Sequence, residues 1–420
     1  MRIPTLYSRL SVAFRGVALR ILALSLLMPV ALLAAATGAL DRFLASGAVK
    51  PGSVAVVVAD LRDGRIIDSH NASLPLIPAS ILKSVTTSTL LSNVGKDFRY
   101  ATEVFADGPV EDGVLRGNLI VKGACDPTLG SSEEPPSTDI ASEVSEALRA
   151  AGIRKVEGAI VLDEDDFAGP SCPPSWLAAD LPHAYGTGSH AINYADNASG
   201  SRSVADPGSR LLVRLRTALG RDGVSVGAEP LPAGKRRILA SHLSAPVDEI
   251  MRSCMMRSDN LFAESMLRTL SARLGGDGST ADGARRELSF WRDAAMPLDG
   301  VEIVDGSGLS RSNRVTADFM SSLLTTMSAD PYYASFFPLA GMEGTLKKFL
   351  ADTPLEGYIA MKTGSMKGIQ CYAGYKLDDD YRPTHVVVVI VNDLTGSRAA
   401  MRQAASRYLL SLFSPDFSQE

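Results

Sequence analysis

The sequence feature that most constrains this fold is a serine and a lysine three residues apart, Ser80 and Lys83, at the start of a predicted helix. Residues three apart lie on one face of an α-helix, so the hydroxyl and the amine can meet. A serine hydroxyl becomes a good nucleophile only when a neighbouring base takes its proton. A lysine can be that base only if burial or nearby positive charge lowers its pKa. The pair therefore predicts a nucleophile and its base, although the same spacing also occurs by chance in surface helices.

Two further motifs, far along the chain, favour the catalytic interpretation. An S-D-N motif at 258–260 precedes a helical pattern, and a K-T-G-S motif at 362–365 continues a predicted strand. Alone, the first is typical of a turn or helix cap and the second of a loop. In this order after S-x-x-K, they form the signature of penicillin-binding proteins and class A β-lactamases. A functional signature requires that the three segments meet in one cleft.

The composition indicates an ordinary globular protein with more than one domain. The chain has 420 residues, of which 45% are hydrophobic and 21% charged. A chain of this length exceeds one typical hydrophobic core. The formal net charge of −5 gives no reason to expect nucleic acid as a partner.

The N-terminus predicts export. Four arginines precede an uncharged apolar run at 21–36 that ends in three alanines. A basic stretch, a short apolar stretch and small residues are typical of a secretory signal, here 1–36. The alternative is an uncleaved anchor, which would give peripheral membrane association. Either way we expect the rest of the chain outside the cytoplasm, in the periplasm.

Strand and helix patterns predict a catalytic domain built from two parts, 37–99 and 237–420. Apolar runs predict strands at 54–59, 66–69, 358–365, 372–377 and 384–391. They would form an antiparallel sheet of about five strands. Helical patterns at 247–256, 261–274, 318–327 and 397–413 would flank it. Between the two parts, 100–236 reads as a smaller inserted α+β domain, with a helix at 140–151 and a strand at 158–163. The expected fold class is α+β.

The four cysteines leave two alternatives open. None has the spacing of a zinc site or a C-x-x-C motif. In an exported chain Cys125 could pair with Cys172, and Cys254 with Cys371. Free thiols are the alternative.

Five segments resemble one branch of the penicillin-recognising serine hydrolases, which share a β-lactamase-like domain. The branch is the D-alanyl-D-alanine carboxypeptidase/endopeptidase family S13, the class C low-molecular-mass penicillin-binding proteins. The segments are 78–80 (PAS), 117–119 (GNL), 126–129 (DPTL), 305–311 (DGSGLSR) and 362–365 (KTGS). The long interval between Ser80 and Ser258 is also similar to this branch. Relatives usually carry a further nested domain, and its shortened counterpart would lie at 193–207.

This resemblance implies acyl transfer. Ser80 would attack the carbonyl between two D-alanines of a peptidoglycan stem peptide, or the carbonyl at a D-amino-acid cross-link, and form an acyl-enzyme. Lys83 would accept the Ser80 proton. Ser258 would relay a proton to the leaving amine, while Lys362 tunes it and Asn260 holds Lys83. β-Lactams would acylate the same serine as covalent inhibitors. No cofactor or metal is expected, and the sequence does not indicate an oligomeric state.

The resemblance also implies a set of substrate-binding residues. Backbone N–H groups of Ser80 and Ser365 would form the oxyanion hole. Thr363, with Lys362, would bind the terminal carboxylate in the K-T-G segment that contains Gly364. Asp163, in an acidic run, would meet an amino group on the third residue of the stem peptide, or be a solvated acid.

Three alternatives stay open at this point. None of the histidines lies in a zinc-peptidase or G-x-S-x-G motif, so structural or surface roles suit them better. A β-lactamase would share the three motifs, but no dedicated deacylating glutamate is evident. A non-enzymatic peptidoglycan-binding protein could keep the fold alone.

Overall fold

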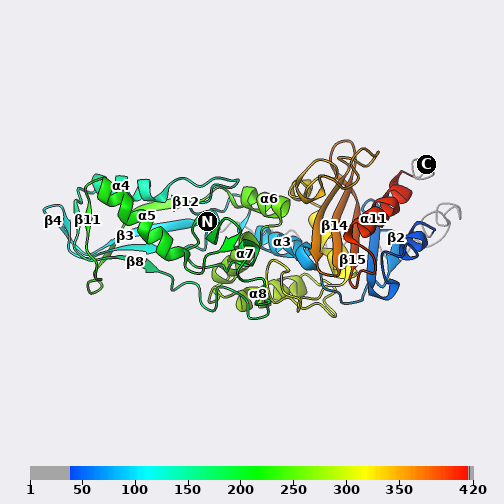
Figure 1. The fold of residues 1–420 in the computed structure, drawn as a ribbon, viewed down its shortest axis with the longest axis horizontal. Helices are drawn as coiled ribbons and strands as arrows, with labels where there is room; N and C mark the ends of the chain where they lie inside the picture. The colour runs from blue at the N-terminus through cyan, green and yellow to red at the C-terminus, as the bar shows by residue number, and fades with distance from the viewer. Residues whose placement is uncertain (1–37, 415, 417–420) are drawn as a thin grey trace.

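The structure is a computed structural model that describes residues 38–414 and residue 416. The predicted signal at 1–36 lies outside the described residues. Among the residues described, no helix combines the length and the apolar character that a membrane crossing requires. Figure 1 shows an elongated molecule with one sheet at its right end, another at its left end and a group of helices between them.

The sheet at the right of Figure 1 contains five strands in the order β13-β14-β15-β1-β2, all antiparallel. The strands are β1 (Val54–Asp60), β2 (Ile66–His70), β13 (Ile359–Met366), β14 (Ile369–Leu377) and β15 (Pro383–Val391). All five expected strands are present, so the predicted antiparallel sheet is confirmed. The K-T-G-S motif lies on β13, which is an edge strand.

Both faces of this sheet are covered, which explains the continuous apolar run of β1. Ala55 and Val57 pack into one core, whereas Val54, Val56 and Val58 pack into another. Side chains alternate between faces along a strand, so a strand buried on both faces shows no alternation of polar and apolar residues, and β1 is apolar up to Asp60 at its end. Helix α11 (Arg398–Phe413) covers the second face.

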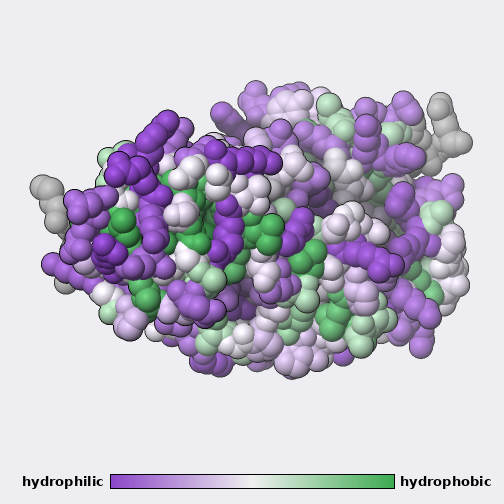
Figure 2. All heavy atoms as spheres, turned by 60° about the vertical axis from the view of Figure 1, so that its left-hand side comes forward, coloured by the Kyte–Doolittle hydropathy of each residue, from purple (hydrophilic) through white to green (hydrophobic). Residues whose placement is uncertain are grey.

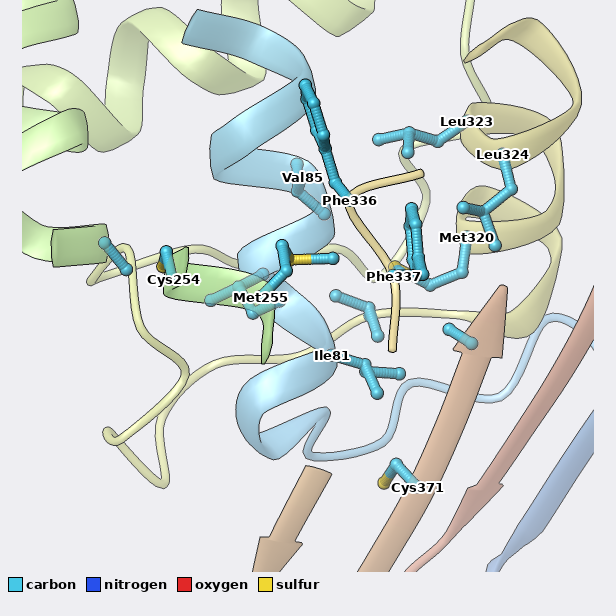
Figure 3. Close-up of a cluster of buried hydrophobic side chains, with 14 of the residues drawn as sticks. Ile81, Val85, Cys254, Met255, Met320, Leu323, Leu324, Phe336, Phe337 and Cys371 are labelled. Carbon is cyan, nitrogen blue, oxygen red and sulfur yellow. The ribbon is translucent and has the colours of Figure 1, made fainter. Parts of the chain in front are cut away.

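The first face is covered by a group of helices that includes the segments with the other two motifs. These are η2 (Ala79–Leu82), α3 (Lys83–Val94), α6 (Val247–Arg257), α7 (Asn260–Arg273), α8 (Thr280–Asp293) and α9 (Ala317–Met327). Figure 3 shows Ile81 and Val85 of the central helix between Met255 of α6 and Phe337, with Cys371 of β14 below. This packing fixes the serine–lysine segment in the middle of the largest core.

The region at the left of Figure 1 has its own core. A four-stranded sheet has the order β12-β3-β6-β8, and a second has the order β11-β7-β5-β4. Their strands are β3 (Ala101–Asp107), β4 (Val110–Glu111), β5 (Val114–Leu115), β6 (Asn118–Lys122), β7 (Lys155–Val156), β8 (Ile160–Asp163), β11 (Ser225–Val226) and β12 (Arg236–Leu243). Helices α4 (Ile140–Ala150) and α5 (Pro207–Arg221) pack on them.

This separate core supports the proposal of an inserted domain. Strand β12 pairs with β3 along its length up to Leu243, beyond the expected end of the insertion at 236. The tract at 193–207 contains a short helical turn, η4 (Ala195–Asn197), and the hairpin β9–β10 (Ala198–Ser199 and Arg202–Ser203), and α5 begins at its last residue. On the face in Figure 2, hydrophilic residues cover most of the surface and hydrophobic ones form scattered patches.

All four cysteines are free, so the disulfide alternative is wrong. Three of the sulfurs have separate polar neighbours. Cys125 Sγ lies 3.3 Å from the Ser189 hydroxyl, and Cys254 Sγ contacts the carbonyl of Asp259 at 3.4 Å. Cys371 Sγ approaches a different carbonyl, at residue 77. Grouping cysteines by predicted domain carries no information on distance, which is why it failed.

Glu287 on α8 is a buried carboxyl without a hydrogen-bond partner for either oxygen among the described residues. Burial raises the pKa of Glu287 from 4.5 to about 8. The folded protein therefore holds a proton that the unfolded chain releases above pH 4.5. Its stability contribution is fully present below pH 4.5 and is lost as the pH rises toward 8.

We therefore expect Glu287→Gln, which cannot titrate, to remove part of the pH dependence of folding stability. Between pH 4.5 and 8 the free energy of unfolding of the variant should fall with pH less steeply than that of the wild type. The two slopes should differ by about 1.4 kcal/mol per pH unit. Urea titrations across this range measure the slope, with the exposed Glu249→Gln as the matched control. Parallel slopes for the wild type and Glu287→Gln would contradict the assignment.

Candidate active site

Ser80 lies in a tight turn between the end of the preceding loop and helix α3. Ala79, which precedes it, has a left-handed φ of 48°, a conformation that non-glycine residues rarely adopt. The turn packs directly against β13: a Cβ on Gly364 would lie 2.6 Å from the Pro78 carbonyl oxygen and 3.1 Å from the Ser80 nitrogen. Only glycine lets the strand approach the serine so closely. The first and third motifs therefore meet.

Lys83 connects the first motif to the second. Its side chain is fully buried, and Nζ lies 3.0 Å from Ser80 Oγ, 2.6 Å from Asn260 Oδ1 and 2.7 Å from the Ser307 carbonyl oxygen. A charged lysine has three protons to donate, which matches these three acceptors. A neutral lysine would keep two of these hydrogen bonds and direct its lone pair at the serine hydroxyl. Burial lowers the pKa of Lys83, which favours that neutral form.

The second motif forms the corner between α6 and α7. Ser258 is left-handed, with φ 61°, and Asp259 caps α7 by accepting a hydrogen bond from the backbone N–H of Phe262. This corner places Asn260 at the first position of α7. The Asn260 side chain reaches in two directions, because its Nδ2 also donates to the Tyr185 carbonyl at 2.7 Å. The inserted region therefore contacts the site directly.

Lys362 and Thr363 use opposite faces of β13. Lys362 pairs with Ala373, which belongs to the core on the α3 side, whereas Thr363 pairs with Tyr372, which belongs to the core on the α11 side. Lys362 is fully buried, and its Nζ donates to the Thr363 carbonyl at 2.9 Å. Burial lowers the pKa of Lys362 well below its usual value, and the positive charge of Lys83 lowers it further. The two amines therefore disfavour each other's charge.

A cavity of about 330 Å³ opens beside the nucleophile. It is lined by Ser80, Ser258, Thr345, Leu346, Phe349, Thr363, Ser365, Gln370, Tyr372 and Arg402. Thr363 Oγ1 lies 2.8 Å from Thr345 Oγ1, and Ser365 Oγ donates to Gln370 Oε1 at 2.8 Å. The cavity thus exposes hydroxyl groups from all three motif-bearing segments. Its chemistry suits an acyl transfer on a substrate that carries a carboxylate.

The loop at 305–310 was missed as part of the site, although its glycines were evident in the sequence. Glu264 Oε1 accepts from the backbone N–H groups of Gly306 at 3.0 Å and Ser307 at 2.8 Å. Asp305 accepts from four donors, the N–H groups of residues 308 and 310 and the side chains of residues 176 and 313. These bonds turn the Ser307 carbonyl toward Lys83. Asn260 and Glu264 lie one helical turn apart on α7, so they share a face of that helix. This spacing could have indicated from the sequence that Glu264 lies near the site and holds a neighbouring loop.

Asp163 lies apart from this group, at the end of β8 in the inserted region. Its Oδ2 accepts a hydrogen bond from Arg236 at 2.6 Å. Burial acts to raise the pKa of Asp163, but the hydrogen bonds from Arg236 and a backbone N–H lower it below the usual value. Asp163 is not among the residues that line the cavity, so its role stays a prediction. Within 38–414, no group of three or more metal-ligating side chains is placed to hold a metal ion.

Comparison with known proteins gives consistent matches. Residues 36–199 and 187–409 match the sequence model of the D-Ala-D-Ala carboxypeptidase 3 (S13) family. The chain is 28% identical to carboxypeptidase DacB of Mycolicibacterium smegmatis, over 83% of this chain and 78% of that protein. Its fold is similar to that of penicillin-binding protein 4 (dacB) from Haemophilus influenzae, with a TM-score of 0.79 and 21% identity. That match covers 89% of this chain and 99% of the other.

The burial of Lys83 predicts how acylation of Ser80 depends on pH. We expect the rate with a fluorescent penicillin to fall as the pH drops below the lowered pKa of Lys83, because an ammonium group cannot accept the serine proton. Lys83→Met should reduce the rate at least about a hundredfold, the usual contribution of a general base. Stopped-flow fluorescence measures the rate, and circular dichroism checks that the variant folds. A rate that is independent of pH, or insensitive to Lys83→Met, would refute the role of the base.

Proposed function

The chain belongs to the D-Ala-D-Ala carboxypeptidase 3 (S13) family, and from this premise we propose how its residues carry out the family's reaction. The enzyme is a serine-type D-Ala-D-Ala carboxypeptidase and D,D-endopeptidase that acts on peptidoglycan stem peptides and cross-links. The observation that carries the proposal is the position of the buried Lys83 amine, 3.0 Å from the Ser80 hydroxyl and hydrogen-bonded to Asn260.

Acylation begins at Ser80. Its oxygen attacks the carbonyl carbon of the scissile amide while its proton passes to neutral Lys83. Asn260 and the Ser307 carbonyl hold the amine so that its lone pair faces the serine. The C–N bond then breaks, and the leaving amine takes a proton through Ser258. Water hydrolyses the resulting ester in the second half of the reaction, as in other covalent catalysis.

Charge in the transition state is stabilised by the backbone. The N–H groups of Ser80 and Ser365 form the oxyanion hole, and the close approach of Gly364 to Ser80 supports this pairing. Thr363 binds the carboxylate next to the scissile bond through its hydroxyl, and Lys362 assists it when its buried amine is protonated. Lys362 also tunes Ser258 in this proposal, and its effect depends on the protonation of the amine, which burial and the Lys83 charge oppose.

The inserted region supplies further substrate contacts in this proposal. Asp163 meets an amino group on the third residue of the stem peptide. Arg236 already pairs with this carboxylate, so a substrate amine would share it. Outside the chemistry, we infer that the protein is exported to the periplasm, with peripheral membrane association if the N-terminal segment is retained. β-Lactams acylate Ser80 covalently and inhibit the enzyme.

Ser80→Ala tests the proposal directly. With the nucleophile removed, release of D-alanine from an un-cross-linked pentapeptide muropeptide should fall to background, and intact-mass spectra should show no penicillin adduct. Wild-type protein should release D-alanine and retain the adduct for many minutes. Rapid turnover of the penicillin would favour a β-lactamase instead. A Ser80→Ala protein with unchanged muropeptide affinity, beside a wild type that releases nothing, would favour a binding protein.

A further inference from the structure

The cavity beside Ser80 extends past the edge of the sheet toward the C-terminal helix. Ser80 and Ser258 lie at one side of it, and Tyr372 of β14 and Arg402 of α11 also line it. Because Thr363 and Tyr372 form a cross-strand pair, their side chains lie on the α11 face of the sheet. The cavity therefore joins the nucleophile to residues of β14 and α11, and we call the end lined by Tyr372 and Arg402 its second part.

The charge of the second part favours an anion. The lining contains no aspartate or glutamate, and its one formally charged side chain is Arg402. Arg402 is exposed, and none of the ion pairs formed among residues 38–414 involves it. Its guanidinium lies close enough to the Tyr372 hydroxyl to lower that group's pKa against the stronger effect of burial. The adjoining hydroxyl and amide groups, from Thr345 and Gln370, are neutral.

The wall of this part is apolar. Leu346 and Phe349 line the cavity, and the Phe349 ring stacks on Tyr372 with centroids 4.9 Å apart. Such a wall suits a short alkyl chain, because it removes methylene groups from water. The cavity therefore combines hydroxyl groups with an apolar wall and a guanidinium.

We propose that Arg402 forms a subsite for a second carboxylate on the leaving-group peptide, so that it selects cross-linked substrates over those that release free D-alanine. The inference rests on the proposed function, because it takes the first carboxylate to bind at Thr363. A D-alanine leaving group carries only that carboxylate and a methyl group. The leaving group of a cross-link carries an alkyl side chain and a further peptide with additional carboxylates, which match the apolar wall and Arg402. A guanidinium binds a carboxylate through two parallel hydrogen bonds.

Arg402→Gln tests the subsite, since it keeps a polar side chain of similar reach and removes the charge. We expect kcat/KM for a cross-linked muropeptide dimer to fall roughly fivefold, the upper range for an exposed ion pair. For an un-cross-linked pentapeptide the change should stay below about twofold. Arg402→Lys should recover part of the loss. The matched control is Arg407→Gln on the same helix, an exposed arginine that does not line the cavity.

A second arm identifies the anion. Amidation of the acceptor-strand carboxylates, except the one next to the scissile bond that binds at Thr363, should lower wild-type kcat/KM by the same factor and leave Arg402→Gln unaffected. If Arg402→Gln lowered kcat/KM equally for the dimer and the pentapeptide, or for neither, the proposed subsite would be wrong. Failure of the proposed function would look different, because wild-type protein would then release no D-alanine and form no penicillin adduct.

Discussion

A single buried amine connects three of the segments that form the site. The three oxygens around Lys83 Nζ come from three separate parts of the chain: Ser80 from η2, Asn260 from α7 and the Ser307 carbonyl from the loop before α9. Each bond is satisfied only when its segment is in place, and an unpaired buried amine would cost several kcal/mol. The arrangement that catalysis needs is therefore also the one in which the buried Lys83 amine makes all three of its hydrogen bonds. The low pKa of Lys83 follows from the same burial.

Two buried acids, Glu264 and Asp305, hold the loop that contacts Lys83. Glu264 fixes the backbone of residues 306 and 307, while Asp305 closes the loop on itself and binds the Trp176 indole. Burial, together with the nearby Asp305 charge, raises the pKa of Glu264 to about 8. Two carboxyl groups so close together disfavour a second negative charge, which suits a site whose base must be neutral. Gly306 also accepts a hydrogen bond from Thr86 through its carbonyl, which connects the loop to α3. Helix α7 thus positions Lys83 both directly and through the loop.

The sequence predicted the five strands of the catalytic sheet, the helices α6, α7, α9 and α11 and the three motifs because each depends on local pattern, whereas α8 (Thr280–Asp293) was not predicted. Continuous apolar runs such as β1 and the three-residue spacing of Ser80 and Lys83 need no tertiary information. The contacts of Ser307 and Tyr185 could not be predicted, since both act through backbone carbonyls that any residue type would provide. The cysteine pairing failed for a related reason, because membership of the same predicted domain does not determine the distance between two sulfurs.

The period of two along β13 explains how one strand serves both the base and the substrate. Lys362 points into the core beside Lys83, where burial lowers its pKa, and Thr363 points to the opposite face at the cavity. A shift of register by one residue would exchange the two, placing the amine in solvent and the hydroxyl in the core. Gly364 prevents such a shift from being accommodated locally, because any side chain there would collide with the Ser80 turn. The register of this edge strand therefore sets two things together: the burial that lowers the pKa of Lys362, and the position of the Thr363 hydroxyl at the cavity.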